Sequence, residues 1–435
     1  MKVAIIGAGI AGLTVAYRLR NTHDVQVFEA QPHIGGHTHT HDVTLQGATY
    51  RVDTGFIVYN DRTYPNFITL LRDLGVASQP TEMSFSMRHE GTGLEYCGTN
   101  LNGVFAQRMN LLRPRFHGML RDILRFNREA PTLLDCPAPG PTLGEYLEQQ
   151  RYGAAFIDNY LAPMGAAIWS SPRARIYDFP ARTFVQFFAN HGLLSLTNRP
   201  QWYVLRGGSS SYVDRLVAAL PNAPITNAPV TRVRRTADAA WVQVRGEAEA
   251  RFDAVVLACH SDQALAMLDA PSKEERDILG AIPFQKNEVT LHTDTRLMPK
   301  QRRAWASWNY CVNVPASDRA TVTYDMNRLQ SLTAPETFCV TLNQRAAIDP
   351  NKVIKVLHYD HPVFTAATLA AQQRHAVISG VNRTFFCGAY WRFGFHEDGV
   401  VSAQHVIEAL QGQGQGQGQQ HDARQATAPR VATRQ

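Results

Sequence analysis

A glycine-rich turn near the N-terminus constrains the fold of this 435-residue chain more than any other feature. Residues 2–7 form a short apolar run that ends in glycine and has the pattern of a buried parallel strand. The segment Gly7–Gly12 follows with the spacing GxGxxG, residues 10–20 have the pattern of a helix, and Val25–Glu29 has that of a second strand. In this strand–turn–helix–strand context the glycine spacing marks a dinucleotide-binding unit, so we expect a Rossmann-type parallel sheet.

Four residues of this unit have separate predicted roles. Gly7 permits the tight turn, Gly9 lets the backbone approach a pyrophosphate, and Gly12 lets the helix pack closely on the strand. The helix N-terminus supplies N–H groups and the positive end of its dipole for a phosphate. Glu29 lies 22 positions after Gly7, where a carboxylate binds a ribose 2′-OH and repels a 2′-phosphate.

Three later elements extend the predicted cofactor site. Gly35 and Gly36 follow the second strand, and Asp53–Phe56 contains a further glycine, so the backbone there can lie against a bulky ligand. Near the C-terminus, Gly388 ends a short apolar strand and Glu397–Val400 opens a last helix. The N-terminus of that helix can donate N–H groups to a flavin carbonyl, where negative charge develops on reduction. A protein that binds only NAD has no use for this late element, so we expect FAD.

The strand and helix signals predict the domain organisation. Parallel-sheet signals occur at three separated places, so we expect a discontinuous FAD-binding domain from residues 1–80, 200–280 and 375–411. Residues 81–199, with a long helical pattern, and 281–374 are expected to form an inserted α+β substrate domain within an overall α/β fold. The Gln- and Gly-rich tail, 412–435, cannot bury enough apolar surface to offset its ordering entropy and is expected to be disordered. The strands expected in the second insertion are Glu288–His292, Ala304–Tyr310, Thr321–Tyr324 and Phe338–Leu342.

Composition excludes several other classes of protein. The six cysteines are scattered and none is in a CxxC pair, so neither a disulfide framework nor a metal site is expected. No apolar run reaches the ~18 residues of a transmembrane helix, and the chain enters a strand directly after Met1-Lys2, without room for a signal peptide. The net charge of +6 favours an anionic partner, but no basic motif interleaved with aromatic residues predicts nucleic-acid binding. We therefore expect a cytoplasmic protein.

Beyond these motifs, the chain resembles the superfamily of FAD-containing amine oxidases, protoporphyrinogen oxidases and phytoene desaturases. It is most similar to a bacterial subfamily of FAD-binding proteins that are often encoded beside cyclopropane-fatty-acid-synthase-like methyltransferases. One branch of that subfamily desaturates methylated phospholipid acyl chains in furan fatty acid biosynthesis. The resemblance covers most of residues 1–410. It is carried by Val52–Asn60, Trp202–Tyr212, Ile282–Asp294, Ala304–Tyr310 and Gly388–Ser402.

The resemblance implies an amine oxidase-like two-domain flavoprotein, with two departures from the family pattern. The cysteine that attaches flavin covalently in amine oxidases has no counterpart, because Cys387 lies on the strand before that place, so FAD is expected to be non-covalent. The lysine near flavin N5 maps closer to Asn287 than to Lys286, and both stay candidates, together with His396 beside the late helix as a proton-transfer group. The expected cofactor-binding residues are Gly7, Gly9, Ile10, Ala11, Gly12, Glu29, Ala30, Gly35, Gly36, His37, Thr54, Gly55, Phe56, Val230, Ala258, Cys259, Gly388, Asp398, Gly399 and Val400.

Three further patterns each have two interpretations. His37, His39 and His41 alternate and would share a face of an extended segment, as loop histidines rather than metal ligands. The Phe-rich segment 179–196, with Phe184, Phe187, Phe188 and Leu194, predicts core packing or the wall of an acyl channel. Residues 108–128 are rich in arginine, and Arg121, Arg125 and Arg128 share one helical face. That face is either simply solvated or a contact with an anionic membrane surface.

Three functions follow from these patterns and the resemblance. The leading hypothesis is hydride removal onto FAD from a C–H bond of an apolar substrate, with a methylated or unsaturated phospholipid acyl chain as the best candidate. The first alternative is an amine oxidase, in which Tyr390 and Trp391 would supply part of an aromatic cage. The second is a non-catalytic FAD-binding subunit that supports a partner such as a lipid methyltransferase.

Overall fold

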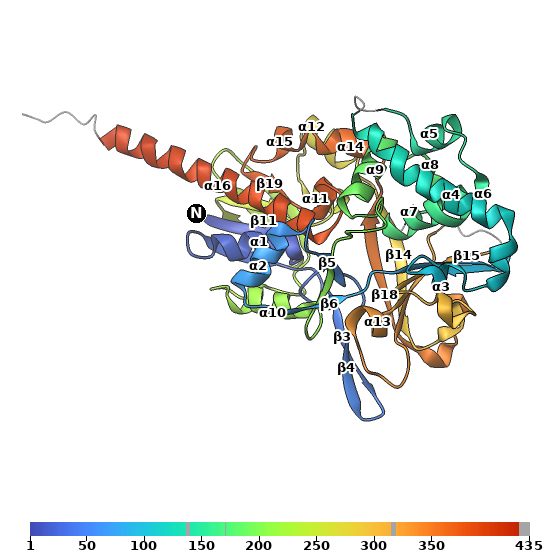
Figure 1. Ribbon diagram of the computed structural model, residues 1–435. Coiled ribbons are helices and arrows are strands. Elements are labelled where there is room, and N and C mark those ends of the chain that lie inside the picture. Colours follow the sequence, from blue (N-terminus) through green and yellow to red (C-terminus); the bar gives the residue numbers. More distant parts are fainter. Residues whose placement is uncertain (136–139, 170, 315–318, 426–435) are drawn as a thin grey trace, which may run out of the picture.

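A four-stranded parallel sheet organises one half of the molecule in the computed structural model (Figure 1). The structure describes residues 1–135, 140–169, 171–314 and 319–425, with side chains beyond residue 412 excluded. The strand order is β19-β13-β1-β2, so segments from the beginning, middle and end of the chain pair side by side. The strands are β1 (Lys2–Ile6), β2 (Asp24–Phe28), β13 (Ala254–Leu257) and β19 (Thr384–Phe386).

Alternating side chains of this sheet enter two different cores, because successive residues of a strand point to opposite faces. Val3 and Ile5 pack under one layer of helices, and Ala4 and Ile6 pack under a second layer of strands and helices. The first layer consists of α1 (Ile10–Leu19), α2 (Pro65–Asp73), α10 (Ser210–Ala218) and α16 (His396–Gln425). The second consists of β10 (Val230–Arg235), β11 (Ala240–Val244), β12 (Ala250–Phe252), α11 (Ser261–Met267), α12 (Lys273–Leu279) and α15 (His375–Ile378).

A seven-stranded sheet forms the other half of the molecule, in the order β18-β14-β17-β16-β15-β7-β8. Only the β15–β7 pair is parallel, and this pair joins residues around 85–89 to residues 308–312. Both stretches expected to form the substrate domain therefore contribute to one sheet. Its strands are β7 (Phe85–His89), β8 (Leu94–Cys97), β14 (Phe284–His292), β15 (Trp308–Val312), β16 (Val322–Asp325), β17 (Cys339–Leu342) and β18 (Val353–Pro362).

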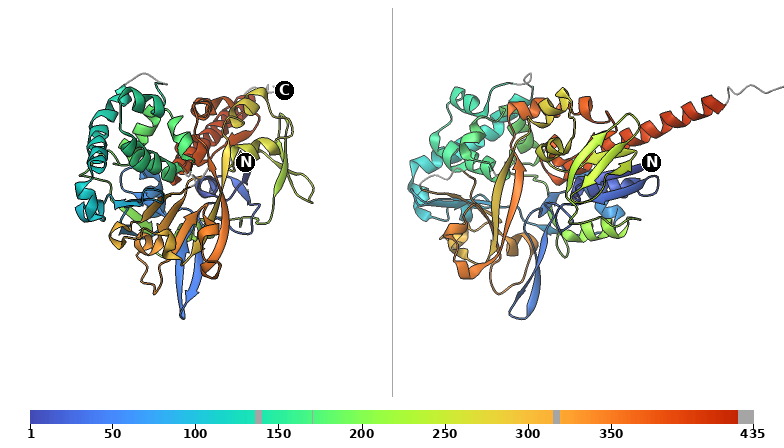
Figure 2. Two further views of the ribbon diagram at one scale, coloured as in Figure 1. Left: turned by 90° about the vertical axis from the view of Figure 1, so that its right-hand side faces the viewer. Right: turned by 180° about the vertical axis from the view of Figure 1, so that it is seen from behind.

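Helices from residues 101–190 cover one face of this sheet (Figures 1 and 2). Their apolar faces bury an aromatic core around Phe126, Phe156, Phe184 and Phe188, all nearly inaccessible to solvent. The main elements are α3 (Leu101–Val104), α4 (Pro114–Glu129), α5 (Leu143–Gln149), α6 (Ala154–Phe156), α7 (Ala162–Trp169), α8 (Arg173–Tyr177) and α9 (Ala181–Asn190). Two short helices, α13 (Met326–Gln330) and α14 (Ala366–Gln372), flank the sheet strands in sequence.

Two small sheets join the halves. The strand β9 (Trp202–Leu205) lies between β5 (Val58–Asn60) and β6 (Ser78–Thr81). The hairpin of β3 (Thr40–Leu45) and β4 (Ala48–Asp53) projects from the lower side of the molecule in Figure 1.

Three elements differ from the sequence-based expectation. Residues 81–199 were expected to be helical but include β7 and β8, short strands that pair with each other, and β7 also pairs with the distant β15. The strand expected at Ala304–Tyr310 begins only at Trp308, because Arg302–Ala304 forms a 3-10 turn. The helix α16 continues to Gln425, through part of the tail expected to be disordered; residues 426–435 of that tail lie outside the described residues.

Candidate functional site

The glycine turn between β1 and α1 leaves room that no side chain fills. A Cβ on Gly7, which has φ +109°, would lie 2.6 Å from the carbonyl oxygen of Ala258, and one on Gly12 would lie 2.1 Å from that of Gly7. Both positions therefore require glycine for the packing of strand and helix. A Cβ on Gly9 would meet nothing within 4 Å, so the turn faces open space where a pyrophosphate would approach the backbone.

Glu29 lies directly after β2 and faces this turn. Its Oε2 accepts the backbone N–H of Ala8 at 2.9 Å, and its Oε1 accepts that of Gln31 at 2.9 Å. The backbone of Glu29 also bonds to Ile225 and Ala228, which places the segment leading to β10 beside it. The carboxylate is thus held at the carboxyl edge of the parallel sheet, where ligands bind in folds of this type.

The glycine pair after β2 lies between the turn and the segment that follows β4. Gly35 donates its N–H to the carbonyl of Ala8 at 2.9 Å, and a Cβ on Gly36 would lie 3.1 Å from the Cα of Gly9. On the other side, Phe56 donates its N–H to the carbonyl of His37 at 2.8 Å. Two segments that the sequence separates by about twenty residues therefore form one continuous wall.

The N-terminus of α16 meets the N-terminus of α1. A Cβ on Gly399 would lie 2.8 Å from the Cγ2 of Ile10, so only glycine allows this approach. Oδ2 of Asp398 accepts the N–H of Phe395 at 2.9 Å and caps α16, while burial raises the pKa of this carboxyl group to about 6. Gly388, at the end of the last strand, donates its N–H to Ser402 at 3.0 Å. Two helix N-termini, each favourable to an anionic group, thus lie together.

The expected cofactor-binding residues converge on this edge and fit FAD. The residues around Gly9, Glu29 and Gly36 form a cradle for a dinucleotide, and the start of α16 adds the site expected for a flavin. Ala258 and Cys259 follow β13 at the same edge, and burial raises the pKa of the Cys259 thiol to about 12, so the thiol stays uncharged. Val230 begins β10 with its side chain packed into the core behind the sheet, and its role in FAD binding stays a prediction.

His396 is buried inside this edge, and its Nε2 has two hydrogen-bonding partners. Its Nε2 is 2.9 Å from Oγ1 of Thr38 and 3.0 Å from the hydroxyl of Tyr212, and its ring stacks on Phe56 with centroids 3.5 Å apart. Burial lowers the pKa of His396 to about 3, so the imidazole is neutral. These contacts suit a residue that positions Phe56 and the segment around it. A proton-transfer role for His396 stays a prediction.

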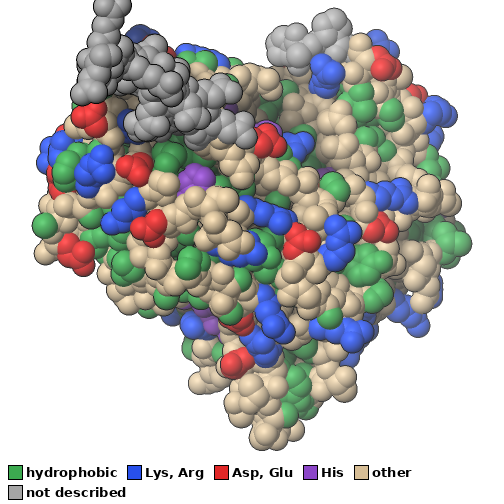
Figure 3. Space-filling view, turned by 90° about the vertical axis from the view of Figure 1, so that its left-hand side faces the viewer, with side chains coloured by type: hydrophobic (Ala, Val, Ile, Leu, Met, Phe, Trp, Pro, Cys, Tyr) green, Lys and Arg blue, Asp and Glu red, His purple; other side chains and the backbone are tan. Residues whose placement is uncertain are grey.

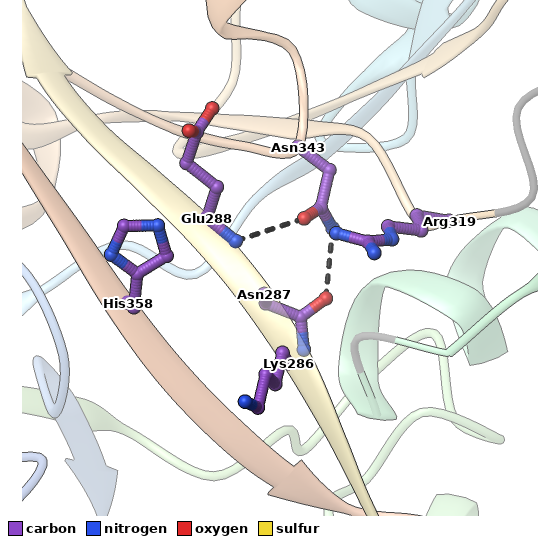
Figure 4. Close-up of a pocket in the computed structure, with 6 residues that line it drawn as sticks. All are labelled: Lys286, Asn287, Glu288, Arg319, Asn343 and His358. Carbon is purple, nitrogen blue, oxygen red and sulfur yellow. Dashed lines mark hydrogen bonds between the residues drawn. The ribbon is translucent and has the colours of Figure 1, made fainter.

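Lys286 and Asn287 are neighbours on β14 but point to opposite faces of the sheet (Figure 4). Lys286 is exposed and lines a hollow of about 240 Å³, and the other residues that line this hollow are Asn287, Glu288, Arg319, Asn343 and His358. Asn287 is completely buried, and it pairs in register with Tyr359, whose hydroxyl lies 3.0 Å from Oγ1 of Thr54. Of the two candidates, Asn287 is therefore the one on the face turned toward the expected cofactor site.

Three histidines from distant segments meet beside Asn287. His37 lies 6.1 Å from His260 and 5.4 Å from His361, between ring centroids. Asn287 donates its side-chain N–H to Nδ1 of His361 at 2.8 Å. Burial, with the neighbouring His260 adding to it, lowers the pKa of His361 to about 4, and burial also lowers the pKa of the other two. The cluster is therefore a set of neutral imidazoles at neutral pH.

His37 and His39 both contact Tyr359, whose ring lies 5.1 Å from that of His37 and whose hydroxyl lies 3.4 Å from Nδ1 of His39. The carbonyl groups of His37 and His39 accept the N–H groups of Phe56 and Thr54, which extends the pairing of β3 and β4 back from Thr40. The ring of His39 stacks on that of His33 at 3.8 Å and lies tilted against that of His41 at 4.0 Å. Burial lowers the pKa of His39 to about 3 and that of His41 to about 4. Among the described residues no histidine, cysteine or carboxylate group of three has the geometry of a metal site.

The two remaining sequence patterns have distinct placements. Phe184, Phe187 and Phe188 are almost inaccessible and pack against Trp169 and one another in the core. Arg125 is engaged by Asp122, by Glu129 and by the ring of Tyr152, 3.9 Å from its guanidinium carbon. Arg128 pairs with Glu129 at 3.0 Å, so the predicted arginine face is largely neutralised.

Sequence reasoning missed His260, His361 and Tyr359 as site residues. His260 had a usable signal, since it follows an all-apolar strand at the edge where ligands bind. His361 and Tyr359 had none, because β18 has no clear alternation and its register with β14 cannot be read from the sequence.

Comparison with known proteins places this geometry in context. Residues 10–304 match the family model described as flavin containing amine oxidoreductase. The fold is similar to that of a putrescine oxidase bound to putrescine, with TM-score 0.67, 16% identity, and coverage of 94% of this chain and 99% of the other. A CLA-producing fatty acid isomerase from P. acnes gives TM-score 0.68 at 17% identity, covering 93% and 97%. Cyclohexylamine oxidase from Brevibacterium oxydans gives 0.66 at 16%, covering 94% and 99%. No curated protein sequence matches the chain significantly.

Proposed function

Because this chain belongs to the family of flavin-containing amine oxidoreductases and is an FAD-dependent oxidoreductase, we propose that it oxidises a fatty acyl chain of a phospholipid, methylated or unsaturated. The reaction proposed is removal of a hydride from a C–H bond, which makes the protein a lipid desaturase or dehydrogenase. FAD is proposed to be held without a covalent bond, since Cys387, directly after β19, is fully buried in the apolar core beneath α1 and α16.

The placement of Asn287 is the observation that carries this proposal. An amine oxidase of the usual kind has a lysine near flavin N5, and here the only lysine of the segment, Lys286, lies on the opposite face of β14. The side chain that faces the expected flavin is a neutral amide, hydrogen-bonded to a neutral imidazole. A site with uncharged walls suits an apolar chain better than a charged amine.

The two aromatic residues that could form an amine cage support the same conclusion. Tyr390 and Trp391 are tilted by 40° to each other at 5.1 Å, and both are packed in the core behind the parallel sheet. A cage needs two rings that face each other across a gap, and this pair does not have that arrangement. The acyl-chain substrate is therefore favoured over a small amine.

The protein's own residues have three tasks in this mechanism. FAD, when bound, supplies the hydride acceptor, and oxygen or another acceptor restores it. The backbone at Gly9 and Gly36 and the start of α16 hold and orient that group. Aromatic side chains such as Phe187 and Phe395, stacked at 5.1 Å, exclude water from the region next to α16. Desaturation also releases a proton, and the neutral imidazoles of His37 and His260 are the proposed acceptors.

Two alternatives remain for the experiment to separate. Structures of the same fold include enzymes named for putrescine and cyclohexylamine as well as one named for fatty acid, so the fold itself does not choose the substrate. The third candidate is an FAD-binding subunit that acts with a lipid methyltransferase and has no oxidase activity of its own.

Anaerobic reduction of the bound flavin tests the proposal. The purified holoprotein is mixed with detergent-dispersed phospholipids carrying methylated or unsaturated acyl chains, and separately with putrescine and cyclohexylamine. Bleaching of the flavin absorbance by the lipids alone is the expected result. Bleaching by the amines instead would overturn the lipid assignment, and no bleaching by either would favour the non-catalytic subunit.

A further inference from the structure

The strongest apolar feature on the surface lies in the connection between β8 and α4. Leu101 and Leu112 are the most exposed large apolar side chains of the described residues, at 77% and 76%. Met109, at 62%, and Leu111, at 50%, lie between them in sequence. Isolated exposed leucines are ordinary, but such a group within twelve residues marks an interaction surface. We call this group, with the exposed Arg108, Arg113 and Arg115, the docking tip.

The docking tip is a formed structure rather than a loose loop. A 3-10 helix spans Arg108–Leu112, and Arg108 donates to the carbonyl of Phe105 at 2.7 Å and also to the side chain of Asn102. His117 contacts the carbonyl of Leu111 at 2.8 Å. The ring of Phe116, buried beneath the tip, lies 5.7 Å from that of Phe105. The 3-10 helix and its hydrogen bonds therefore keep the leucines exposed to solvent, although the apolar core around Phe116 lies directly beneath them.

The charge around the tip has one sign. Residues 96–121 contain four arginines and no aspartate or glutamate. None of Arg108, Arg113, Arg115 and Arg121 forms an ion pair with another described residue, in contrast to Arg125 and Arg128. Elsewhere, as on the face drawn in Figure 3, basic and acidic side chains are intermixed. The partner of the tip should therefore be anionic.

We propose that the docking tip inserts into an anionic lipid bilayer. The leucines and Met109 would enter the boundary of the acyl chains while the arginines contact the headgroups, as in interfacial membrane segments. A second copy of this chain is disfavoured, because a two-fold contact would bring the arginines of both copies together without an acidic residue of the tip to pair them. A water-soluble polyanion would not cover the leucines.

The position of the tip agrees with this role. The elements α3 and α4 that bracket it lie at the end of the molecule away from the N-terminus and the parallel sheet (Figures 1 and 2). Docking there leaves the cofactor half free of the membrane and puts the helical layer next to it. No helix of the described residues is long and apolar enough to span a bilayer, so the attachment proposed is peripheral. The inference adds to the proposed function, which requires access to lipid, without depending on it.

Vesicle sedimentation of the full-length holoprotein tests the tip. We expect binding to vesicles of phosphatidylcholine mixed with phosphatidylglycerol, and at least tenfold weaker binding to phosphatidylcholine alone. Leu111→Ser with Leu112→Ser should weaken binding to the mixed vesicles about tenfold or more. Each of Arg113→Ser and Arg115→Ser should weaken it about fivefold, and added salt should do the same. The matched control is Val377→Ser with Val381→Ser, which removes two exposed valines from another surface and should leave binding unchanged.

Several outcomes would overturn the inference. Unchanged vesicle binding of the Leu111/Leu112 variant, equal losses in the control, or no binding by the parent protein would each do so. Loss of self-association in that variant, seen by gel filtration, would assign the tip to a second copy instead. Flavin reduction by detergent-dispersed lipid is measured on the same samples. If the Leu111/Leu112 variant loses vesicle binding but its flavin is still reduced by dispersed lipid, both proposals are supported. If the parent protein binds vesicles but its flavin is not reduced by lipid, only the proposed function is refuted.

Discussion

The side-chain amide of Asn287 donates a hydrogen bond to Nδ1 of His361 over 2.8 Å. Asn343 fixes the orientation of that amide, because its own N–H donates to Oδ1 of Asn287 at 2.8 Å while its Oδ1 accepts the backbone N–H of Glu288 at 3.0 Å (Figure 4). Nδ1 of His361 is therefore an acceptor, and the neutral imidazole carries its hydrogen on Nε2. A buried strand position thus sets the tautomer of a histidine in the candidate site.

Removing this hydrogen bond should raise the pKa of His361. The bond favours the neutral imidazole, since a protonated Nδ1 could not accept it. In Asn287→Ala we expect the pKa to rise from about 4 to roughly 5, because a hydrogen bond of about 1 kcal/mol corresponds to somewhat under one pH unit. Histidine NMR titration of labelled holoprotein measures this value directly.

Lys286→Ala is the matched control for that variant. Lys286 directly precedes Asn287 on the same strand but is exposed on the other face. We expect this variant to leave the pKa of His361 unchanged. The rate of flavin reduction should stay within about twofold of that of the parent protein. A large loss of flavin reduction in Lys286→Ala, with Asn287→Ala unaffected, would contradict the assignment of the cofactor-facing side of β14.

The parts of the site that could be predicted from the sequence are those formed by residues close together in the chain. The turn, Gly9 and Glu29 follow from a local pattern, because the positions lie within one βαβ unit and the chain geometry of that unit is nearly fixed. The start of α16 was found because glycine and acidic residues before an apolar helical pattern are a local signal too. Each of these predictions needed only neighbouring residues.

The meeting of Asn287 and His361 could not be predicted in this way. The two residues are 74 positions apart and meet through a nine-residue register between β14 and β18. A shift of one residue would turn Asn287 to the other face and bring Lys286 inward. The same limit explains the missed hairpin of β7 and β8, which is short and joins the sheet only through the pairing of β7 with the distant β15.

Replacing His396 should make the protein less sensitive to acid. Burial lowers the pKa of His396 to about 3, against about 6.5 in the unfolded chain, so unfolding takes up a proton between those values. Stability from this group is fully present above pH 6.5 and is lost as the pH falls toward 3. In His396→Gln, which keeps a partner for Thr38 and Tyr212, we expect about one proton fewer to be taken up on unfolding at pH 5.

The measurement is urea unfolding of parent and variant at several values between pH 7 and pH 5. Asp53 and Asp398 act in the opposite direction, because burial raises the pKa of each to about 6. Their contribution to the free energy of unfolding is therefore lost as the pH rises from about 4 to 6. For each protein, the free energy of unfolding is plotted against pH, and the slopes of the two plots are compared. The two carboxyl groups contribute equally to both slopes and cancel in the difference. Equal slopes would show that His396 is not held neutral by burial.

Glu29→Ala should weaken FAD binding while leaving the fold intact. The carboxylate is half-buried at the sheet edge and holds the N–H groups of Ala8 and Gln31. A hydrogen bond to a charged group contributes about 1.5–3 kcal/mol, so we expect FAD binding to weaken roughly 10- to 100-fold. The occupancy of purified protein, from absorbance and from the chromophore released on denaturation, measures the loss. Glu148→Ala, at an exposed helix position, should retain full occupancy.

Two glycines of the same turn should respond to alanine in different ways. At Gly12 a Cβ would lie 2.1 Å from the carbonyl oxygen of Gly7, so Gly12→Ala must separate α1 from β1 and should destabilise the whole fold. At Gly9 a Cβ would meet nothing within 4 Å, so Gly9→Ala should fold as well as the parent protein. The added methyl group would, however, occupy the space through which the pyrophosphate approaches the backbone.

We therefore expect Gly9→Ala to lose FAD without losing structure. Its thermal unfolding midpoint, compared with that of parent protein stripped of flavin, should be unchanged, while its FAD content should fall at least tenfold. Gly12→Ala should have a lower midpoint than the stripped parent, because its defect lies in the protein's own packing. Full FAD content in Gly9→Ala would show that the pyrophosphate does not bind at this turn. A pyrophosphate in contact with the backbone at Gly9 would leave no room for the added methyl group.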